Sequence, residues 1–316
     1  MGKIKDKYAS FLTSFLRRKI WFGEIFLSLQ GYRGPEPYKQ VVMPAMAKAR
    51  NTIDSLDHFR VDNSPGFDYE VRREDLWQWY ALDRLNDLMK LIYQGDRQFY
   101  RPAAGHGSQW ERSLKSPGND RGFDWSDHPI TREQYLEFFA SLGFEIFTDR
   151  PYHPFYYEIV EAVETPGLLE EVKVDHVYWP GLMFGSMMFS RAGARVLFRP
   201  GAMDKTVAET SQLYFTYWRL HRKAIDLSHG WGHNSQWRTR FRRDYETFDR
   251  FIFNIDGHRV LNEFADYRTW LVDEEPDDLT MNERIELLTN RCFIRCLKDD
   301  GDRWPFDDKY EIAKSQ

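Results

Sequence analysis

Cysteine is scarce in this chain of 316 residues, which contains only Cys292 and Cys296. Two cysteines cannot build the dense disulfide framework that holds small secreted domains together. We interpret both as small apolar residues on one face of a helix, because helical side chains four positions apart share a face. Such sparing use of cysteine suits a reducing compartment, and we expect a cytoplasmic protein.

Long hydrophobic runs are missing as well. No part of the sequence holds the roughly 18 consecutive apolar residues that a membrane-spanning helix needs. The stretch from Lys3 to Lys19 has no small-residue cleavage site after it, so we do not expect a signal peptide. Asp6 stands where a myristoylation signal has Ser or Thr, so that lipid is not expected either. The sequence predicts a soluble protein without a transmembrane segment.

Charge of one sign does not dominate the chain. Lys and Arg number 44 against 49 Asp and Glu, which gives a formal net charge of −5. This balance provides no general attraction to nucleic acid. Hydrophobic residues make up 42% and aromatic residues 16% of the chain, which is enough for a substantial folded core.

Common catalytic and cofactor motifs are also missing. The sequence has no Gly-x-Ser-x-Gly elbow, no phosphate loop ending in Gly-Lys-Ser or Gly-Lys-Thr, and no Gly-x-Gly-x-x-Gly after a strand. Serine-hydrolase, nucleoside-triphosphatase and dinucleotide-binding hypotheses therefore have no support. The sequence identifies no cofactor, and it leaves open whether the protein is an enzyme.

Hydrophobic spacing divides the chain into three parts. Residues 1–95 show helical spacing, whereas residues 96–129 are rich in Gly, Pro, Ser, Asp and Asn and predict a long loop or lid. Residues 130–316 mix strand and helix patterns and carry the candidate site. We expect an α+β fold, with a mostly helical N-terminal part packed on a central, mainly antiparallel sheet with flanking helices. The first and third parts are equally compatible with one continuous domain.

Several local signals are sharper than this division. Capping boxes predict helices that begin after Thr131 and Thr280, and the second of these should extend through Cys296. A further helix is expected over about 206–223. Asp256-Gly257 is typical of a two-residue turn, so we predict a β-hairpin around it.

The most unusual segment runs from Ser228 to Tyr245 and combines two His, two Trp, one Asn, one Gln and four Arg. A hydrophobic core does not need this mixture, whereas a ligand pocket uses flat apolar walls and directed hydrogen bonds. We predict a pocket with Trp231 and Trp237 as its walls. The amides of Asn234 and Gln236 would bind the polar edges of the ligand.

Arginine and histidine supply charge and acid–base chemistry to the same segment. If a helix begins near Trp237, Arg238 and Arg242 share one face and can hold a carboxylate or phosphate. The alternative is that these arginines pair with the acidic run at 273–278 or lie in water. His229 and His233 are the candidate acid or base, because the unperturbed pKa of histidine is about 6.5.

Three functions remain open on this evidence. We favour binding of a small anionic or planar molecule, with acid–base catalysis by His229 or His233 as an addition. An alternative is a protein–protein interaction module without catalysis, since Trp and Arg are enriched at the centres of interfaces. The third is a metal-dependent enzyme that uses His229 and His233. Its further ligands would come from His153, Glu158, Glu161, Asp175 or His176.

Overall fold

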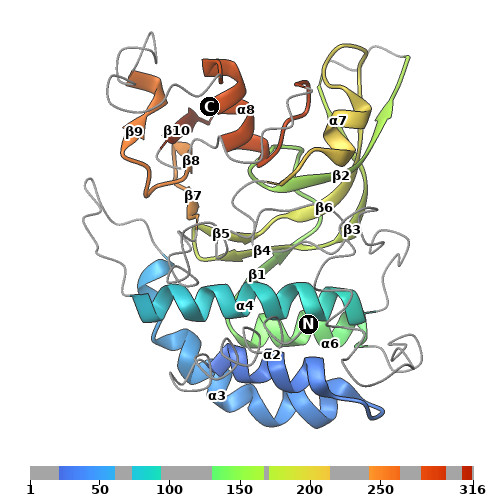
Figure 1. Cartoon of the computed structure of the whole chain (residues 1–316), viewed down its shortest axis with the longest axis vertical. Helices are drawn as coiled ribbons and strands as arrows, with labels where there is room; N and C mark the ends of the chain where they lie inside the picture. Colours follow the sequence, from blue (N-terminus) through green and yellow to red (C-terminus); the bar gives the residue numbers. More distant parts are fainter. Residues whose placement is uncertain are drawn as a thin grey trace, which may run out of the picture.

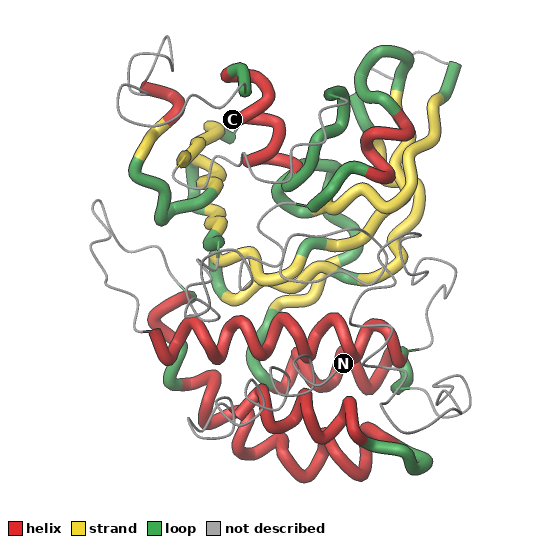
Figure 2. The backbone as a smooth tube through the Cα atoms, in the orientation of Figure 1, coloured by secondary structure: helices red, strands yellow, loops and turns green. Residues whose placement is uncertain are grey.

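The protein combines one layer of helices with two β-sheets. The computed structural model describes residues 21–60, 73–93, 130–166, 171–213, 242–263, 279–296 and 308–314. The helices of the first part of the chain lie beneath one part of the larger sheet. The rest of that sheet rises on the left of the view, and the second sheet lies on the right (Figure 1). The same division is visible when the backbone is coloured by secondary structure (Figure 2). The expected α+β fold with a helical N-terminal part is confirmed.

The helical layer is built from amphipathic segments that bury one face. In α2 (Trp21–Gly31), Phe22, Ile25, Phe26 and Leu29 are buried at helical spacing. The capping box at the start of α6 is confirmed, because Thr131 Oγ1 accepts from the Gln134 N–H at 3.2 Å. In this layer the described elements are α2 (Trp21–Gly31), η1 (Tyr38–Val42, a π-helix), α3 (Met43–Asp54), η2 (Asp57–Phe59), α4 (Arg73–Ile92) and α6 (Arg132–Ser141).

The larger sheet is antiparallel except at one edge. Its strand order is β1-β4-β5-β7-β8-β10-β9, and the β10–β9 pair is parallel. The strands are β1 (Glu145–Phe147), β4 (Gly181–Phe184), β5 (Met187–Ser190), β7 (Asp244–Glu246), β8 (Arg250–Phe253), β9 (Arg259–Val260) and β10 (Asp308–Ala313).

The smaller sheet continues directly from the larger one. Its order is β2-β6-β3, with β2 parallel and β3 antiparallel to β6. Between β5 of the large sheet and β6 of the small sheet stands a single residue, Arg191. The remaining elements are β2 (Tyr157–Glu164), β3 (Lys173–Trp179), β6 (Ala192–Phe198), α7 (Lys205–Thr210), η5 (Leu261–Glu263) and α8 (Met281–Asn290).

Two hydrophobic cores hold these layers together. In the first, between the helices and the large sheet, Trp79 packs edge-on against Phe59 and Phe184 at ring distances of 5.4 and 5.1 Å. This core contains side chains from both 1–95 and 130–316, so hydrophobic packing crosses the boundary suggested by the sequence. The second core fills the space between strands of the two sheets, α7 and α8.

Gly185 connects the β4–β5 turn to the helical layer. Its φ is +61°, and a Cβ there would lie 2.2 Å from the carbonyl oxygen of Arg60. That carbonyl also accepts hydrogen bonds from Ser186 N and Oγ at 2.7 and 3.0 Å. We expect Gly185→Ala to lower the free energy of unfolding by about 2 kcal/mol, because it adds backbone strain and displaces this contact.

Gly201→Ala is the matched control for this substitution. Gly201 also has a positive φ, +80°, but no described residue has an atom within 4 Å of the position that its Cβ would take. Gly201→Ala should therefore lower the free energy of unfolding only through backbone strain, by about 1 kcal/mol. Urea denaturation of both variants measures the difference, and equal losses would show that the Arg60 contact contributes nothing.

The last predicted helix is shorter than expected. Its capping box at Thr280 is confirmed, but α8 ends at Asn290, and Arg291 adopts φ 59° as its C-cap. This left-handed conformation ends the helix and turns the Arg291 side chain toward Asp244. Cys292 and Cys296 thus follow the helix, and the prediction that they share a helical face is wrong.

The hairpin predicted at Asp256-Gly257 is also wrong. A turn does follow β8, but β8 and β9 are not neighbours, because β10 lies between them. β10 pairs Tyr310 with Phe253 and Asp308 with Arg259. A strand from the far end of the sequence therefore takes the position that a local hairpin would fill.

The helix predicted over 206–223 begins near the expected place but ends early. α7 starts with the side chain of Asp204 as its N-cap and ends at Thr210. Ser211 then takes an extended ψ of 147°, and its hydroxyl donates to the carbonyl of Phe293. Residues 214–223 of the prediction lie outside the described residues. In the ranges that the structure describes, no helix has the length and apolarity needed to cross a bilayer.

Candidate functional site

The structure describes one of the eight site residues predicted from the sequence, Arg242. That the other seven lie together in one site stays a prediction, and so does the metal hypothesis that depends on His229 and His233. Across the described ranges, no group of three His, Cys, Asp or Glu side chains is placed to hold a metal ion. The seven outside the described residues are His229, Trp231, His233, Asn234, Gln236, Trp237 and Arg238.

The helix predicted to carry Arg242 is not formed in its last part. Asp244–Glu246 is strand β7, in which Asp244 pairs with Met188 of β5 and Tyr245 with Ile252 of β8. Side chains two apart in extended chain share a face. Arg242 therefore lies beside Asp244, and its Nε donates to Asp244 Oδ1 at 2.6 Å.

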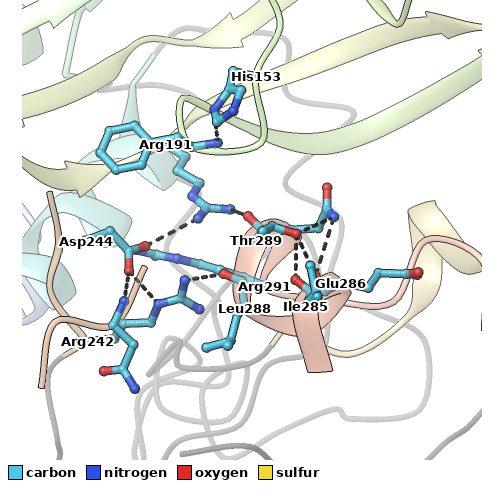
Figure 3. A network of polar contacts seen from close by, with 12 residues as sticks. His153, Arg191, Arg242, Asp244, Ile285, Glu286, Leu288, Thr289 and Arg291 are labelled. Carbon is cyan, nitrogen blue, oxygen red and sulfur yellow. Dashed lines mark hydrogen bonds and ion pairs between the residues drawn. The ribbon is translucent and has the colours of Figure 1, made fainter. Parts of the chain in front are cut away.

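Three arginines surround the carboxylate of Asp244. Besides Arg242, Nη2 of Arg191 and Nη2 of Arg291 donate to Asp244 Oδ2 at 3.3 and 3.1 Å. Figure 3 shows the three guanidinium groups converging on this carboxylate from different parts of the fold. All four residues are buried. We call Arg191, Arg242 and Arg291 the arginine cluster.

The arginine cluster also binds the C-terminal end of α8. Arg191 Nη1 donates to the carbonyl of Thr289 at 2.8 Å, and Arg242 Nη2 donates to the carbonyl of Leu288. The last carbonyls of a helix have no partner within it and carry partial negative charge, so cations stabilise this end. The cluster therefore connects the C-terminal end of α8 to β7 and to Arg191, the residue between β5 and β6.

Burial makes the electrostatics of this cluster strong. Burial alone would raise the pKa of Asp244, but the charges of Arg242, Arg291 and Arg191 outweigh it and hold the pKa well below its usual range. Burial and the neighbouring charge of Arg291 lower the pKa of Arg191. Asp244 and the buried Glu158 act in the opposite direction on Arg191. The cationic form of Arg191 is thus held in the interior at a cost.

His153 lies next to the cluster, above Arg191 in Figure 3. Its ring stacks on Phe251 with 4.2 Å between centroids, and its Nδ1 accepts from the Phe155 N–H at 3.2 Å. Burial, followed by the charge of Arg191, lowers the pKa of His153 to about 4. His153 is therefore neutral at pH 7, and its pKa depends in part on the positive charge of Arg191.

A second buried ion cluster adjoins the first through Asn254. The Asn254 N–H donates to Asp244 Oδ1 at 2.8 Å, and its side-chain amide donates to the Asp308 carbonyl at 2.7 Å. The Asp308 carboxylate pairs with Arg284 and Arg259, each at 2.8 Å. This second cluster joins α8 to the β9–β10 edge of the sheet.

A cavity among the described residues lies elsewhere. It has a volume of about 650 Å³ and is lined by residues 148–152, Tyr157 and 171–177. Tyr152 and Tyr157 stack in its wall at 6.1 Å. Asp175 at its rim pairs with Arg195 at 2.5 Å. Charges of both signs line this cavity, so it shows no preference for one class of ligand.

Comparisons of the chain with protein-family models, with curated proteins and with solved structures find no match.

Proposed function

We propose that the protein binds a small anion at the arginine cluster. The main observation in its support is that three buried guanidinium groups converge on one carboxylate, that of Asp244. Arginine is suited to carboxylates and phosphates because its planar fork of donors matches their oxygen atoms. In a buried position, a further anion would interact with this charge far more strongly than in water.

Unused donor capacity supports the same proposal. In the described part of the molecule, Nε of Arg191 and Nε of Arg291 are buried and make no hydrogen bond. A buried guanidinium N–H without a partner is costly, since it has lost its hydrogen bond to water. An anionic oxygen near these atoms would satisfy both the donors and the charge. Phosphate, sulfate and carboxylate groups all have this chemistry.

We further propose that the segment at 228–241, which lies outside the described residues, contributes to this site. Trp237 is five residues before Arg242 in the sequence, so its Cα lies within about 18 Å of the Cα of Arg242. Under our proposal, Trp231 and Trp237 would contact a planar part of the ligand, and Asn234 and Gln236 its polar edges. Arg238 would add a further positive charge, and His229 or His233 would supply acid–base catalysis if a reaction occurs.

Arg291→Gln tests the proposal, with inorganic phosphate and sulfate as the ligands. We expect this substitution to weaken anion binding at least about tenfold, the loss expected for one charged hydrogen bond. Isothermal titration calorimetry measures the affinity, and circular dichroism checks that the variant is folded. Arg195→Gln is the matched control, because Arg195 is a surface arginine paired with Asp175. Equal affinities for the wild-type and Arg291→Gln proteins, or no anion binding by the wild type, would overturn the proposal.

The remaining alternatives keep their own tests. A metal-dependent enzyme requires a divalent ion to stabilise the protein and His229→Ala to abolish that effect. An interaction module at 228–241 would show neither anion nor metal binding. We also propose a cytoplasmic location, supported by Cys292 and Cys296, which are both free thiols.

A further inference from the structure

The two oxygen atoms of Asp244, the negative group at the centre of the arginine cluster, are not held equally. Oδ1 accepts from Arg242 Nε at 2.6 Å and from the Asn254 N–H at 2.8 Å. Among the described residues, Oδ2 accepts from Nη2 of Arg191 and of Arg291, at 3.3 and 3.1 Å (Figure 3). Normal N–H···O distances run from about 2.7 to 3.2 Å, so Oδ2 is the weakly bound oxygen and can accept a further hydrogen bond.

The buried donors that have no hydrogen bond lie next to Oδ2. Nε and Nη2 form one edge of a guanidinium group, and the two donors of an edge bind neighbouring acceptor atoms. In Arg191 and Arg291, Nη2 donates to Oδ2 of Asp244, whereas Nε is buried and has no hydrogen bond in the described part of the chain. A ligand oxygen bound by either Nε atom therefore lies beside Oδ2.

Asp244 stays ionised in this position. Burial would raise its pKa, but the charges of Arg242, Arg291 and Arg191 hold the pKa well below its usual range. An ionised carboxylate accepts hydrogen bonds and cannot donate one. A ligand oxygen next to Oδ2 is therefore stabilised if it carries a proton, and it is repelled if it is a bare anionic oxygen.

Backbone geometry also points to Asp244. Besides glycine, three residues in the described part of the chain have a positive φ. Two of them, Asn254 at 55° and Arg291 at 59°, donate to the Asp244 carboxylate. Residues other than glycine rarely adopt this conformation, and where they do it is often at a binding site. The fold therefore holds two unusual backbone positions that place donors around one carboxylate.

We propose that the site selects oxyanions that carry a proton, namely protonated phosphate and phosphonate groups, over fully ionised ones such as sulfate. This inference rests on the proposed function, because it concerns the same anion at the same arginines. The guanidinium groups bind the anionic oxygens of the ligand, and its P–OH group donates to Asp244 Oδ2. Sulfate and sulfonates have the same tetrahedral shape but no proton to donate. Asp244 is thus a specificity-determining residue.

Calorimetric titration of the wild-type protein at pH 6 with two matched pairs of ligands tests this inference. Methylphosphonate and methanesulfonate are both monoanions at this pH and differ by one proton, and inorganic phosphate carries a proton that sulfate lacks. Each phosphorus ligand should bind about 100-fold more tightly than its sulfur partner, the factor expected for one hydrogen bond to a charged group. Charge alone predicts the opposite order for phosphate and sulfate, because sulfate is the more negative ion. Phosphate represents the free ion and methylphosphonate a substituted one, so the two pairs also distinguish these sources.

Asp244→Asn should remove the preference. The amide of Asn can donate to a bare oxygen, so the sulfur ligands should bind this variant as tightly as the phosphorus ligands do. Asp256→Asn is the matched control and should keep the preference, because Asp256 pairs with a different buried arginine, Arg243, at 2.8 Å. Carbon-13 NMR of the Asp244 carboxyl group in the wild type tests the same assignment without a variant, since bound methylphosphonate should shift its resonance.

The outcomes separate this inference from the proposed function. Equal affinities within either pair, or tighter binding of the sulfur ligand, would show that Asp244 does not select the ligand, although the anion site itself would stand. A preference that a folded Asp244→Asn protein retains, or bound methylphosphonate that leaves the Asp244 resonance unchanged, would also overturn the inference. If none of the four ligands binds, the proposed function fails and this inference fails with it.

Discussion

Asp244→Asn should lower the free energy of unfolding by about 3–5 kcal/mol, because it leaves buried guanidinium groups without their shared counter-charge. Asp244 is fully buried and accepts hydrogen bonds from Arg191, Arg242 and Arg291. The substitution changes little in shape, since Asn has nearly the same size. The loss therefore measures charge rather than packing. Urea denaturation at pH 7 gives the free energies for both proteins.

Asp249→Asn is the matched control for that experiment. Asp249 also pairs with an arginine, Arg250, at 2.6 Å, but its side chain is 56% exposed. Exposed ion pairs contribute little to stability, so this variant should stay close to the wild type. Comparable losses for the two variants would mean that Asp244 does not act through its burial.

The same variant connects stability with the proposed function. With Asp244 neutralised, the arginine cluster has a larger surplus of positive charge, so sulfate or phosphate should stabilise Asp244→Asn more than the wild type. A larger anion-induced rise in melting temperature in the variant is the expected result. If the two proteins respond equally, the anions bind away from Asp244.

Local chemistry explains which helix boundaries could be predicted from the sequence. The capping boxes at Thr131 and Thr280 use side chains three residues apart, so their outcome depends on nothing outside the helix start. The predictions were wrong where contacts with distant segments of the chain determine the secondary structure. Residues 244–246 form strand β7 because they pair with β5 and β8. No hairpin forms after β8, because β10 pairs with β8 instead.

Contacts between distant segments also limited how much of the arginine cluster could be predicted from the sequence. Arg242 was identified from its neighbours in the sequence, but its partners were not. Arg191 and Arg291 lie 53 and 47 positions from Asp244, and no local spacing connects them. One signal was available, since Arg191 interrupts an apolar stretch between two buried strands. A charged residue in such a place needs a buried partner, although the sequence does not say which one.

His153 should make the protein sensitive to mild acid. Its pKa is about 4 in the folded protein, against about 6.5 in an unfolded chain. Between these values the unfolded chain binds a proton that the folded protein does not. Stability therefore falls as the pH drops from about 6.5 to 4 and levels off below that. Because the ring is partly exposed, we expect His153 to account for about 2–3 kcal/mol of this loss.

His153→Phe isolates this contribution. The phenyl ring can keep the stack on Phe251 but cannot accept the Phe155 N–H, so the variant should be about 1 kcal/mol less stable than the wild type at pH 7. Near pH 4.5 it should be the more stable protein, because it has no imidazole to protonate. Urea denaturation across this range measures the crossover, and His176→Phe, at an exposed site, should show none. Parallel curves for His153→Phe and the wild type would exclude His153 as the source of acid sensitivity.

The acid response also depends on the arginine cluster, because the charge of Arg191 contributes to the low pKa of His153. An anion bound at the cluster offsets that charge and should raise the pKa of His153 toward 6.5. Titration of the His153 ring by NMR, with and without sulfate, measures this directly. A pKa that rises with sulfate would place the anion near Arg191. An unchanged pKa despite measured binding would place the anion beyond the reach of this field, and the proposed site would then be wrong even though the protein binds anions.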